Sequence, residues 1–503
     1  MRRTSRYGVA AAALATAALV MSACTATPPA LPPSARTSPP TQPPQQGTPG
    51  ASSPAAPAPG APPRRMLAAA RSTPVEDPYY PRTSNPGVDA LHYHLALQWD
   101  GTVLTGEATV IIRAMASTRS LRLDLSSVLD VSGVALDERP IRYTHPGDSL
   151  VMTVPQVATG SQHTLTIDYA GSPQPVPAPS GRGDLQEGLG WSLDPEGDVY
   201  TFQEPYGAYT WYPVNDHPSD KALYDVRVTV PRGEVAVFNG SLEGHGPAGP
   251  DATTWRWHLA EPAASYLTTI AVGPYSAFHD TMPDGTPATY WLLPQDRQLL
   301  ASLRAESRRA FAWLVDGAGD YPFDTFGVVI VGGESGMETQ SLVTLSRGAL
   351  DRPDAVLEHE IAHQWFGDAV TPTDWQGLWL SEGWAMWLQQ AYERDRGGYE
   401  YAGGMSRWRP LDNAARRRAG PPGDYAPTSF GDVNVYLGPA MMLDRIRQRV
   451  GDREFAVLTK AWVAEHEYGN VDRAEFIRWL DAETGQSFAG LISRWLDSPT
   501  TPR

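Results

Sequence analysis

One short stretch, LEHEIAHQWFGD at Leu357 to Asp368, constrains this chain more than any other. It contains two histidines, His359 and His363, spaced four residues apart, and Glu360 directly follows the first. Residues four apart lie on the same face of an α-helix, so both imidazoles can reach one metal ion. Glu360 can then reach a water beside that ion. The stretch therefore predicts a metal-binding helix, although five residues alone are a weak signal.

A catalytic zinc site needs a third protein ligand, and Glu382 is the best candidate. Eighteen residues separate it from His363, and it lies in the run WLSEGWAMWLQQAYERD, which predicts a second helix. We expect this helix to begin near Ser381 as its N-cap, with Glu382 in the first turn. Metalloproteases with three histidine ligands have Gly and His where this chain has Phe366 and Ala369. The predicted ligands of one zinc ion are therefore two histidines and a glutamate.

Hydrophobic periodicity divides the folded chain into two parts. In residues 77–275, apolar residues alternate with polar ones, as in HYHLALQW, TLTIDY and DVRVTVP. This period of two predicts an antiparallel all-β domain. In residues 276–499, SLRAESRRAFAWLVDGAG predicts an amphipathic helix and FGVVIVGG a buried strand, and the pattern beyond Leu350 is helical almost to the end. We therefore predict an α+β second domain whose later half is mostly helical.

The N-terminus predicts an exported protein. Arg2, Arg3 and Arg6 precede the apolar run GVAAAALATAALVMSA, which ends at Cys24. This layout is typical of a secretory signal, here residues 1–23. Because VMSAC is similar to a bacterial lipobox, we expect Cys24 to be lipidated and to anchor the protein to the cell membrane, outside the cytoplasm. Without lipidation the protein would be secreted. Residues 24–76 are rich in Pro and Ala and predict a disordered linker.

Charge and cysteine content exclude several functional classes. The formal net charge of −16 argues against a nucleic-acid partner and against electrostatic docking on anionic lipid. We therefore expect contact with a membrane only through the lipid anchor. Cys24 is the only cysteine, so no internal disulfide can form. The sequence does not determine the oligomeric state, for which a monomer is the simplest expectation.

Further motifs carry a family resemblance. The HExxH pentapeptide, followed after eighteen residues by Glu382 within WLSEGWA, resembles the aminopeptidase N family (peptidase family M-one) of gluzincin zinc metallopeptidases. SGMETQS is similar to the G-x-M-E-N segment of that family, with Glu338 twenty-one residues before His359. EPYGAYTWYPVNDHPSDKALYDVRVTVP and YPFDTFG resemble two further family segments. The resemblance covers roughly residues 77–496 and implies a saddle-like β-sheet domain followed by a thermolysin-like catalytic domain.

The resemblance also implies a reaction, the hydrolysis of the N-terminal residue from peptides by a zinc metalloaminopeptidase. His359, His363 and Glu382 would hold the zinc ion. Glu360 would act as the general base on the attacking water. Tyr436, in VYLGPAMMLDRI, would donate a hydrogen bond to the oxyanion that forms in the reaction.

Four further residues would bind the substrate, by the same resemblance. Glu338 and Glu204 would bind the free ammonium group of a peptide or protein N-terminus. Gly336 and Met337 would line the pocket of the first side chain and offer backbone hydrogen bonds to an extended peptide.

The chain departs from the family pattern at several positions. Thr339 stands where the family has Asn, and Ser335 replaces the usual first Gly. Gly438 and Pro439 follow Tyr436 in place of the family residues. The last residues resemble the close of the catalytic domain, where larger relatives continue into a helical domain, so we expect a short form with a more open site.

Two alternatives stay open. An endopeptidase or an epoxide hydrolase could use the same scaffold, although Glu338 and Glu204 favour a substrate with a free ammonium group. A non-catalytic surface-binding protein could retain the fold, although all three ligands and the base are present. The sequence specifies neither the preferred N-terminal residue nor the physiological substrate.

Overall fold

The computed structural model describes residues 64–349, 353–397 and 401–503. The predicted signal segment, Cys24 and the linker up to residue 63 lie outside the described residues. The described part begins with α1 (Arg64–Ala69), so ordered structure starts before residue 77, where we expected the folded body to begin. Ser72 provides the reason, because its backbone N–H donates to Asp89 Oδ1 at 3.0 Å and its hydroxyl oxygen accepts from the Lys221 N–H at 3.0 Å. These hydrogen bonds hold the end of the expected linker against the β domain.

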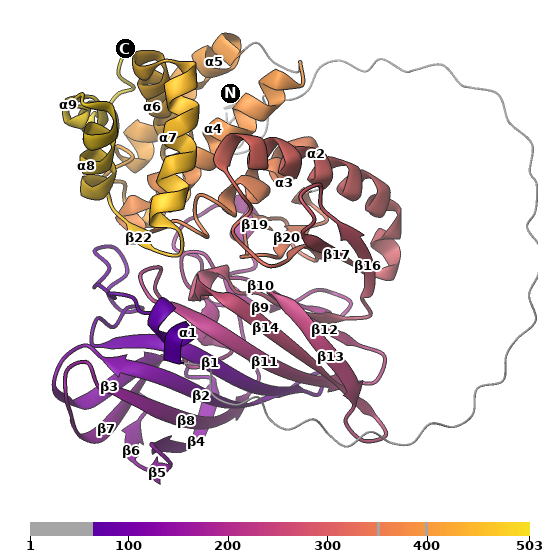
Figure 1. The fold of residues 1–503 in the computed structure, drawn as a ribbon. Coiled ribbons are helices and arrows are strands. Elements are labelled where there is room, and N and C mark those ends of the chain that lie inside the picture. Colours follow the sequence, from indigo (N-terminus) through magenta and orange to yellow (C-terminus); the bar gives the residue numbers. More distant parts are fainter. Residues whose placement is uncertain (1–63, 350–352, 398–400) are drawn as a thin grey trace, which may run out of the picture. The chain divides into compact units, whose positions relative to one another are not determined.

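The β domain is built on an eight-stranded sheet of order β13-β14-β11-β1-β2-β8-β4-β5 (Figure 1). Its strands are β1 (Val88–Trp99), β2 (Leu104–Ala114), β4 (Leu129–Leu136), β5 (Arg139–Pro140), β8 (Gln162–Gly171), β11 (Lys221–Pro231), β13 (Ser241–Pro247) and β14 (Ala252–Ala264). A three-stranded sheet contains β3 (Thr118–Asp124), β7 (Ser149–Val157) and β6 (Arg142–Thr144). A four-stranded sheet contains β12 (Val235–Phe238), β15 (Ile270–Gly273), β10 (Val199–Phe202) and β9 (Gly190–Leu193).

The predicted alternation is confirmed along β1. Tyr93, Leu95, Leu97 and Trp99 are all buried, whereas Gln98 between them is exposed. The large sheet differs from the prediction in one respect, because β1 and β11 pair in parallel. Between β8 and β11 the chain forms β9 and β10 in another sheet and then returns in the direction of β1, which is the long crossover that a parallel pair requires.

The second domain begins with a five-stranded sheet of order β16-β17-β18-β20-β19. Its strands are β16 (Ser276–Thr281), β17 (Pro287–Leu292), β18 (Phe326–Val331), β19 (Gly336–Met337) and β20 (Val343–Ser346). The FGVVIVGG run forms β18, in which every residue is buried, as a continuous apolar run predicts. β19 is the edge strand, and this position leaves one of its sides free of strand partners in the sheet.

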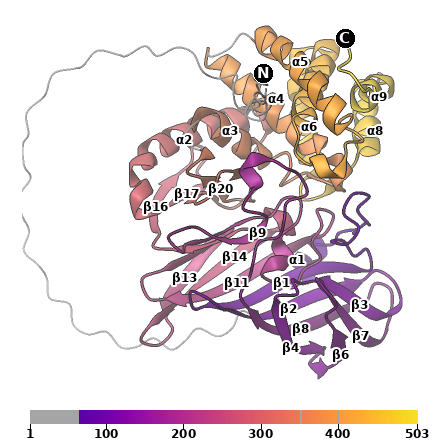
Figure 2. The same ribbon diagram turned by 180° about the vertical axis from the view of Figure 1, so that it is seen from behind.

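Helices make up most of the second domain (Figures 1 and 2). They are α2 (Leu300–Ala318), α3 (Pro353–His363), α4 (Trp379–Asp395), α5 (Tyr401–Ala419), α6 (Asn434–Val450), α7 (Asp452–His466), α8 (Arg473–Thr484) and α9 (Ala489–Asp497). A short parallel pair, β21 (Thr371–Pro372) with β22 (Asn470–Val471), ties the turn after α3 to the segment before α8. Across the described residues, every helix is too short or too polar to cross a membrane.

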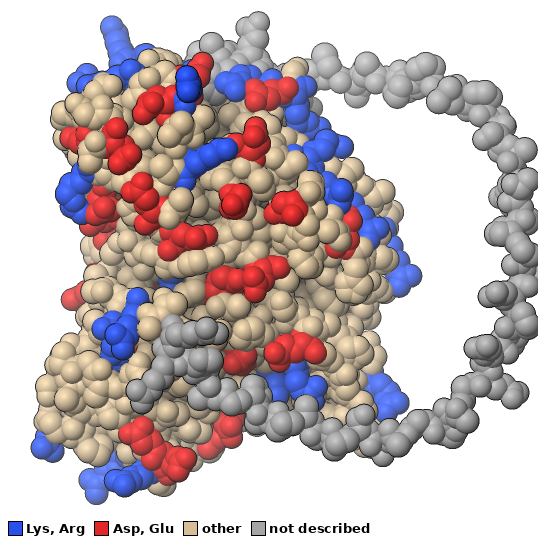
Figure 3. Space-filling view, viewed as in Figure 1, with Lys and Arg blue, Asp and Glu red and all other residues tan. Residues whose placement is uncertain are grey.

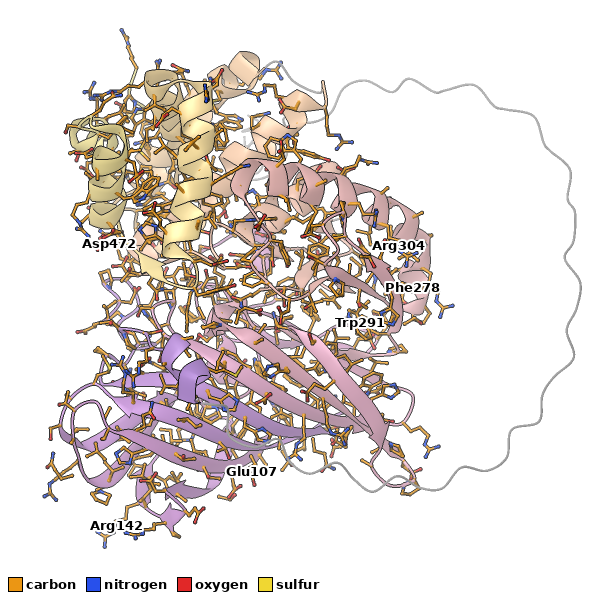
Figure 4. The ribbon with its side chains drawn as sticks, viewed as in Figure 1. Glu107, Arg142, Phe278, Trp291, Arg304 and Asp472 are labelled. Carbon is orange, nitrogen blue, oxygen red and sulfur yellow. The ribbon has the colours of Figure 1, made fainter. Side chains whose placement is uncertain are left out.

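The two domains are packed directly on each other. Trp291 of β17, labelled in Figure 4, contacts Trp257 of β14 with ring centroids 5.6 Å apart. The buried Lys221 of β11 donates from Nζ to the carbonyl oxygens of Asp368 at 2.8 Å and of Ala369 at 3.1 Å. These two carbonyls belong to the turn that follows α3, so the β domain helps to hold the end of the helix that carries the two histidines.

Candidate functional site

Three predicted ligand side chains meet where α3 packs against α4. His359 Nε2 lies 3.1 Å from Glu382 Oε2 and 3.0 Å from His363 Nε2. His363 Nε2 lies 3.3 Å from the same carboxylate oxygen, so the three atoms form a nearly equilateral triangle. Zinc bonds of about 2.0–2.1 Å at tetrahedral angles separate ligand atoms by about 3.3 Å. The donor atoms and their spacing therefore fit one zinc ion.

Hydrogen bonds at Nδ1 of His363 leave its Nε2 free to bind a metal. His363 Nδ1 lies 3.0 Å from the carbonyl oxygen of Phe366 and 3.0 Å from Ser381 Oγ. A carbonyl oxygen only accepts, so His363 carries its hydrogen on Nδ1 and turns the lone pair of Nε2 toward the triangle. The predicted role of Ser381 as a helix cap is therefore replaced by a role in orienting a ligand.

Ser381 does not cap α4, because the helix begins before it. A short 3₁₀ turn at Trp375–Gly377 runs directly into the helix, with Leu378 already helical, so α4 starts at Trp379, before Ser381. Asp374 caps this turn by accepting from the Gly377 N–H. Glu382 still lies in the first turn of α4, as predicted.

Electrostatics favour the charged form of the glutamate ligand. Burial raises the pKa of the Glu382 carboxyl, but the charge of His363 in its protonated form and the hydrogen bonds from both histidines outweigh burial and hold the pKa well below the usual range. Glu382 therefore stays ionised at neutral pH and contributes the negative charge that a zinc ligand set needs.

The predicted base lies beside the triangle on the same helix. Glu360 is 7% exposed, and burial, followed by the negative charge of Glu338, raises its pKa well above the usual range of a glutamate. A carboxylate with a raised pKa is a better proton acceptor near neutral pH. Gly336 of β19 faces it, and a Cβ at that glycine would lie 2.7 Å from Glu360 Oε1. The glycine is therefore needed for the close approach of the edge strand to the base.

The edge strand is held onto the metal-binding helix by Gln364. Its Nε2 donates to the carbonyl oxygen of Glu338 at 3.0 Å, and its Oε1 accepts from the Ser341 N–H at 2.8 Å. The side chain of Glu338 is 4% exposed, and its Oε1 has no hydrogen-bond partner among the described residues. Met337 is also buried and belongs to a hydrophobic cluster that the β domain shares with residues of the second domain.

Glu204 reaches the same site from the β domain. It follows β10 and is partly buried. Burial raises its pKa well above the usual range, and the charges of Glu338 and Glu382 raise it further. The negative charges of two acidic side chains from different domains thus interact beside the zinc ligands. Such a pair is costly unless a cation joins it.

The departure at Thr339 has a structural explanation. Its side chain is fully buried, and its hydroxyl donates to the carbonyl oxygen of Leu342 and lies 2.8 Å from Thr344 Oγ1 on β20. Thr344 Oγ1 in turn donates to Thr269 Oγ1 at 3.3 Å. The threonine therefore fixes the turn between β19 and β20 and takes no position facing the site.

The altered residues after Tyr436 fit the packing of α6 on α4. The Tyr436 ring lies 5.9 Å from the imidazole of His359, measured between centroids. Three residues further on, Pro439 packs against Gly383, where an added Cβ would lie 2.5 Å from Pro439 Cβ. Because Gly383 directly follows Glu382, this contact sets the distance between the tyrosine and the metal ligands.

Sequence reasoning missed two residues of the site. Arg182 Nη1 donates to the Tyr436 hydroxyl at 3.4 Å, and its Nε and Nη2 pair with both oxygens of Asp184, at 3.1 and 2.6 Å. Asp184 also accepts from Ser335 Oγ at 3.0 Å. Both residues lie in the Pro- and Gly-rich connection PQPVPAPSGRGDLQEG between β8 and β9, where no periodicity or spacing marks them.

Comparisons with known proteins agree with this geometry. The Peptidase family M1 domain matches residues 319–495, and the Peptidase M1 N-terminal domain matches residues 89–267. Aminopeptidase N of Acetobacter pasteurianus is 26% identical over 318 residues, which are 58% of this chain and 85% of that protein. Aminopeptidase N of Streptomyces lividans is 24% identical, over 62% of this chain but only 40% of its own length.

Solved structures show the same fold. The M1 zinc metallopeptidase of Deinococcus radiodurans is 25% identical, with a TM-score of 0.73 over 85% of this chain and 98% of its own. A mutant of that enzyme bound to a Tyr-Ser-Ala substrate gives a TM-score of 0.74, also at 25% identity and over the same shares of the two chains. Both domain matches, this fold and the three-ligand zinc site show that the chain belongs to peptidase family M1, as a zinc metalloaminopeptidase with an N-terminal β domain and a mostly helical catalytic domain.

Proposed function

We propose that this protein removes the N-terminal residue from peptides outside the cytoplasmic membrane. The single observation that carries the choice of substrate is Glu338, a buried carboxylate with one oxygen unpartnered among the described residues, beside the zinc ligands. A buried carboxylate is stable only when a cation or hydrogen bonds compensate its charge. The ammonium group of a peptide N-terminus supplies both.

The substrate would lie with its free end between the two domains. Glu338 and Glu204 bind the ammonium group, which places the first peptide bond next to the zinc ligands. The peptide extends along β19, whose edge position leaves backbone groups for a strand-like pairing. Gly336 gives the peptide backbone close access to Glu360.

The chain's own groups then move the proton. The chemistry that zinc supplies when bound is polarisation of the scissile carbonyl and activation of water at neutral pH. Glu360 accepts the proton of the attacking water and delivers it to the leaving amine. Tyr436 donates a hydrogen bond to the oxyanion, an interaction typically worth about 10²–10³ in rate.

Acidic side chains are also scattered over the surface. On the face shown in Figure 3, Asp and Glu lie over both domains, whereas a row of Arg side chains follows α2. Together with the net charge of −16, this surface favours the approach of positively charged peptide ends.

The location outside the membrane rests on the N-terminal sequence. A basic start, an apolar run and a single cysteine at Cys24 support export and lipidation there. The test is detergent phase partitioning of the protein from cells, with Cys24→Ala as the comparison. We expect the wild-type protein in the detergent phase and the variant in the aqueous phase. Wild-type protein in the aqueous phase would contradict lipid anchoring.

The activity is tested with a panel of fluorogenic aminoacyl amides. We expect hydrolysis by the zinc-loaded protein, loss of activity and of bound zinc on chelation, and recovery of both when zinc is returned. Zinc content measured on the same samples separates loss of metal from unfolding. Undiminished hydrolysis by metal-free protein would reject the proposal.

A further inference from the structure

Tyr436 is contacted by an arginine from the other domain. Arg182 reaches the site from the connection between β8 and β9, and its Nη1 lies 3.4 Å from the tyrosine hydroxyl. Its side chain is 29% exposed, so the guanidinium is largely enclosed. Gly431, just before α6, lies so close that a Cβ there would overlap Nη1. The guanidinium is thus confined between the connection and the start of the helix that carries Tyr436.

Arg182 is itself fixed by a two-point ion pair. Nε lies 3.1 Å from Asp184 Oδ1 and Nη2 lies 2.6 Å from Asp184 Oδ2, which is the planar fork geometry that arginine and carboxylate share. Asp184 Oδ2 also accepts from Ser335 Oγ at 3.0 Å. Ser335 adjoins β19, and its carbonyl oxygen accepts from the Ser346 N–H of β20 at 3.0 Å. The pair therefore links the edge of the catalytic sheet to the tyrosine.

The direction of the hydrogen bond between Arg182 and Tyr436 follows from the chemistry of the two side chains. Arginine has donors and no acceptor, so the Tyr436 oxygen must accept from Nη1. The hydroxyl hydrogen is then left to point elsewhere. Tyr436 also lies beside the zinc ligands, because its ring is 5.9 Å from the imidazole of His359 between centroids and its hydroxyl interacts with Glu382. A positive charge behind the phenol also strengthens it as a donor, because it draws electron density from the O–H group.

We propose that Arg182, held by Asp184 and Ser335, is a positioning residue that aims the hydroxyl hydrogen of Tyr436 at the oxyanion of the reaction. This role gives Ser335 a function at a family glycine position, since a glycine there has no hydroxyl to donate to Asp184. The inference rests on the proposed aminopeptidase activity and adds to it a residue that binds neither substrate nor zinc.

The test is a double-mutant cycle of Arg182→Ala and Tyr436→Phe with a fluorogenic aminoacyl amide. Removing a residue that orients a catalytic group typically costs about 10–100-fold. We expect Arg182→Ala to lower kcat by that factor with KM within about twofold of wild type. In the Tyr436→Phe background the same change has no hydroxyl to orient, so we expect less than about a twofold further loss.

Two further variants and a rescue experiment test whether the effect is specific to Arg182. Arg182→Lys keeps the charge but cannot bond Asp184 and Tyr436 together, so its kcat should fall between those of the wild type and Arg182→Ala. Added guanidinium should restore part of the kcat of Arg182→Ala and none in the double mutant. Arg113→Ala, which removes a comparable arginine–aspartate pair with Asp89 far from Tyr436, should leave kcat unchanged. Zinc content and the thermal unfolding midpoint are measured for every variant.

Several outcomes would overturn the inference. Equal losses in both backgrounds would mean that Arg182 acts independently of Tyr436, and a raised KM with unchanged kcat would make it a substrate-binding residue. An unchanged kcat in Arg182→Ala would mean that Arg182 has no role in the reaction. If Arg182→Ala does not fold, a wild-type kcat in Arg182→Lys overturns it as well. Failure of the wild-type protein to cleave any aminoacyl amide would instead reject the proposed function and is seen before any variant is made.

Discussion

Gln364, the residue after the second zinc ligand, donates from Nε2 to the carbonyl oxygen of Glu338 at 3.0 Å. One side chain thus connects the metal-binding helix to the loop that carries the proposed ammonium ligand. Its other end accepts from the Ser341 N–H, so the loop is held at two points. The distance between the metal ligands and the carboxylate proposed to bind the substrate's free end is set by this amide. An exopeptidase needs that distance to be constant.

Replacing Gln364 should weaken substrate binding more than metal binding. In Gln364→Met the side chain keeps its approximate size, but the Glu338 carbonyl and the Ser341 N–H lose their buried partner, at a cost of about 1–3 kcal/mol. We expect KM for aminoacyl amides to rise about tenfold or more, with zinc content unchanged. Steady-state kinetics and metal analysis check this. A variant that lost zinc but kept its KM would show that the amide serves the metal site instead.

The role of Glu360 is tested by Glu360→Gln, which keeps the shape and removes the base. We expect kcat to fall by about 10²–10⁴-fold while the zinc content stays at the wild-type level. Measurements of kcat and of bound zinc on the wild type and on Glu360→Gln test this prediction. Full activity in a zinc-loaded Glu360→Gln protein would mean that another group takes the proton.

The close approach of β19 to the base gives a third prediction. Gly336→Ala places a Cβ 2.7 Å from Glu360 Oε1 and 2.8 Å from Val356 Cγ1, so the carboxylate or the strand must move. A misplacement of about 1 Å can cost as much as 100-fold in rate. We expect kcat/KM to fall by at least tenfold with little change in the unfolding midpoint. Gly246→Ala on β13, with no atom within 4 Å of the added Cβ, is the matched control. Equal kcat/KM in the two variants would contradict the prediction.

The sequence predicted the metal ligands because their chemistry fixes their spacing, and it predicted the sheets because burial on one face produces alternation. His359, His363 and Glu382 are recognisable from a pentapeptide and one interval. Arg182 and Asp184 were not predictable, because their role depends on where the connection between β8 and β9 lies in space. The start of α4 was misjudged at Ser381, since a serine in a first turn has the same local pattern as a cap.

The pairing of β1 with β11 could not be predicted for a similar reason. Alternation shows that a strand has one buried face, but it carries no information about the direction of its neighbour. The parallel register, for example Leu95 opposite Val226, depends on the long excursion through β9 and β10.

A buried ion cluster in the β domain predicts a pH dependence of stability. Asp225 Oδ2 lies 2.8 Å from His92 Nε2 and its Oδ1 lies 2.7 Å from His258 Nδ1. Burial raises the pKa of Asp225, but hydrogen bonds from His258 and His92 outweigh it and hold the pKa below its usual range. The hydrogen bond to Asp225 raises the pKa of His258.

The pKa shifts of Asp225 and His258 limit the pH range in which this cluster stabilises the fold. Stability from Asp225 is present above its unfolded pKa of about 3.9 and is lost as pH falls through the folded value. Stability from protonated His258 is fully present below about pH 6.5 and is lost as pH rises through its raised folded pKa. The cluster therefore stabilises the fold most between about pH 4 and 6.5.

Urea unfolding of Asp225→Asn against wild type across pH 3–9 checks this window. We expect the variant to lose on the order of 1.5–3 kcal/mol near pH 5.5 and clearly less at both extremes. Asp130→Asn, at an exposed position on β4, is the control and should show no such window. A difference between Asp225→Asn and wild type that stays constant with pH would contradict the assignment.

The central claim, cleavage one residue from a free amino end, is tested most directly by comparing one peptide with and without an N-acetyl group. Acetylation removes the ammonium charge that Glu338 and Glu204 are proposed to bind and leaves every peptide bond intact. Product analysis by mass spectrometry with zinc-loaded protein should show stepwise loss of N-terminal residues from the free peptide and no cleavage of the acetylated one. Equal cleavage of both peptides, or cuts at internal bonds, would contradict the account.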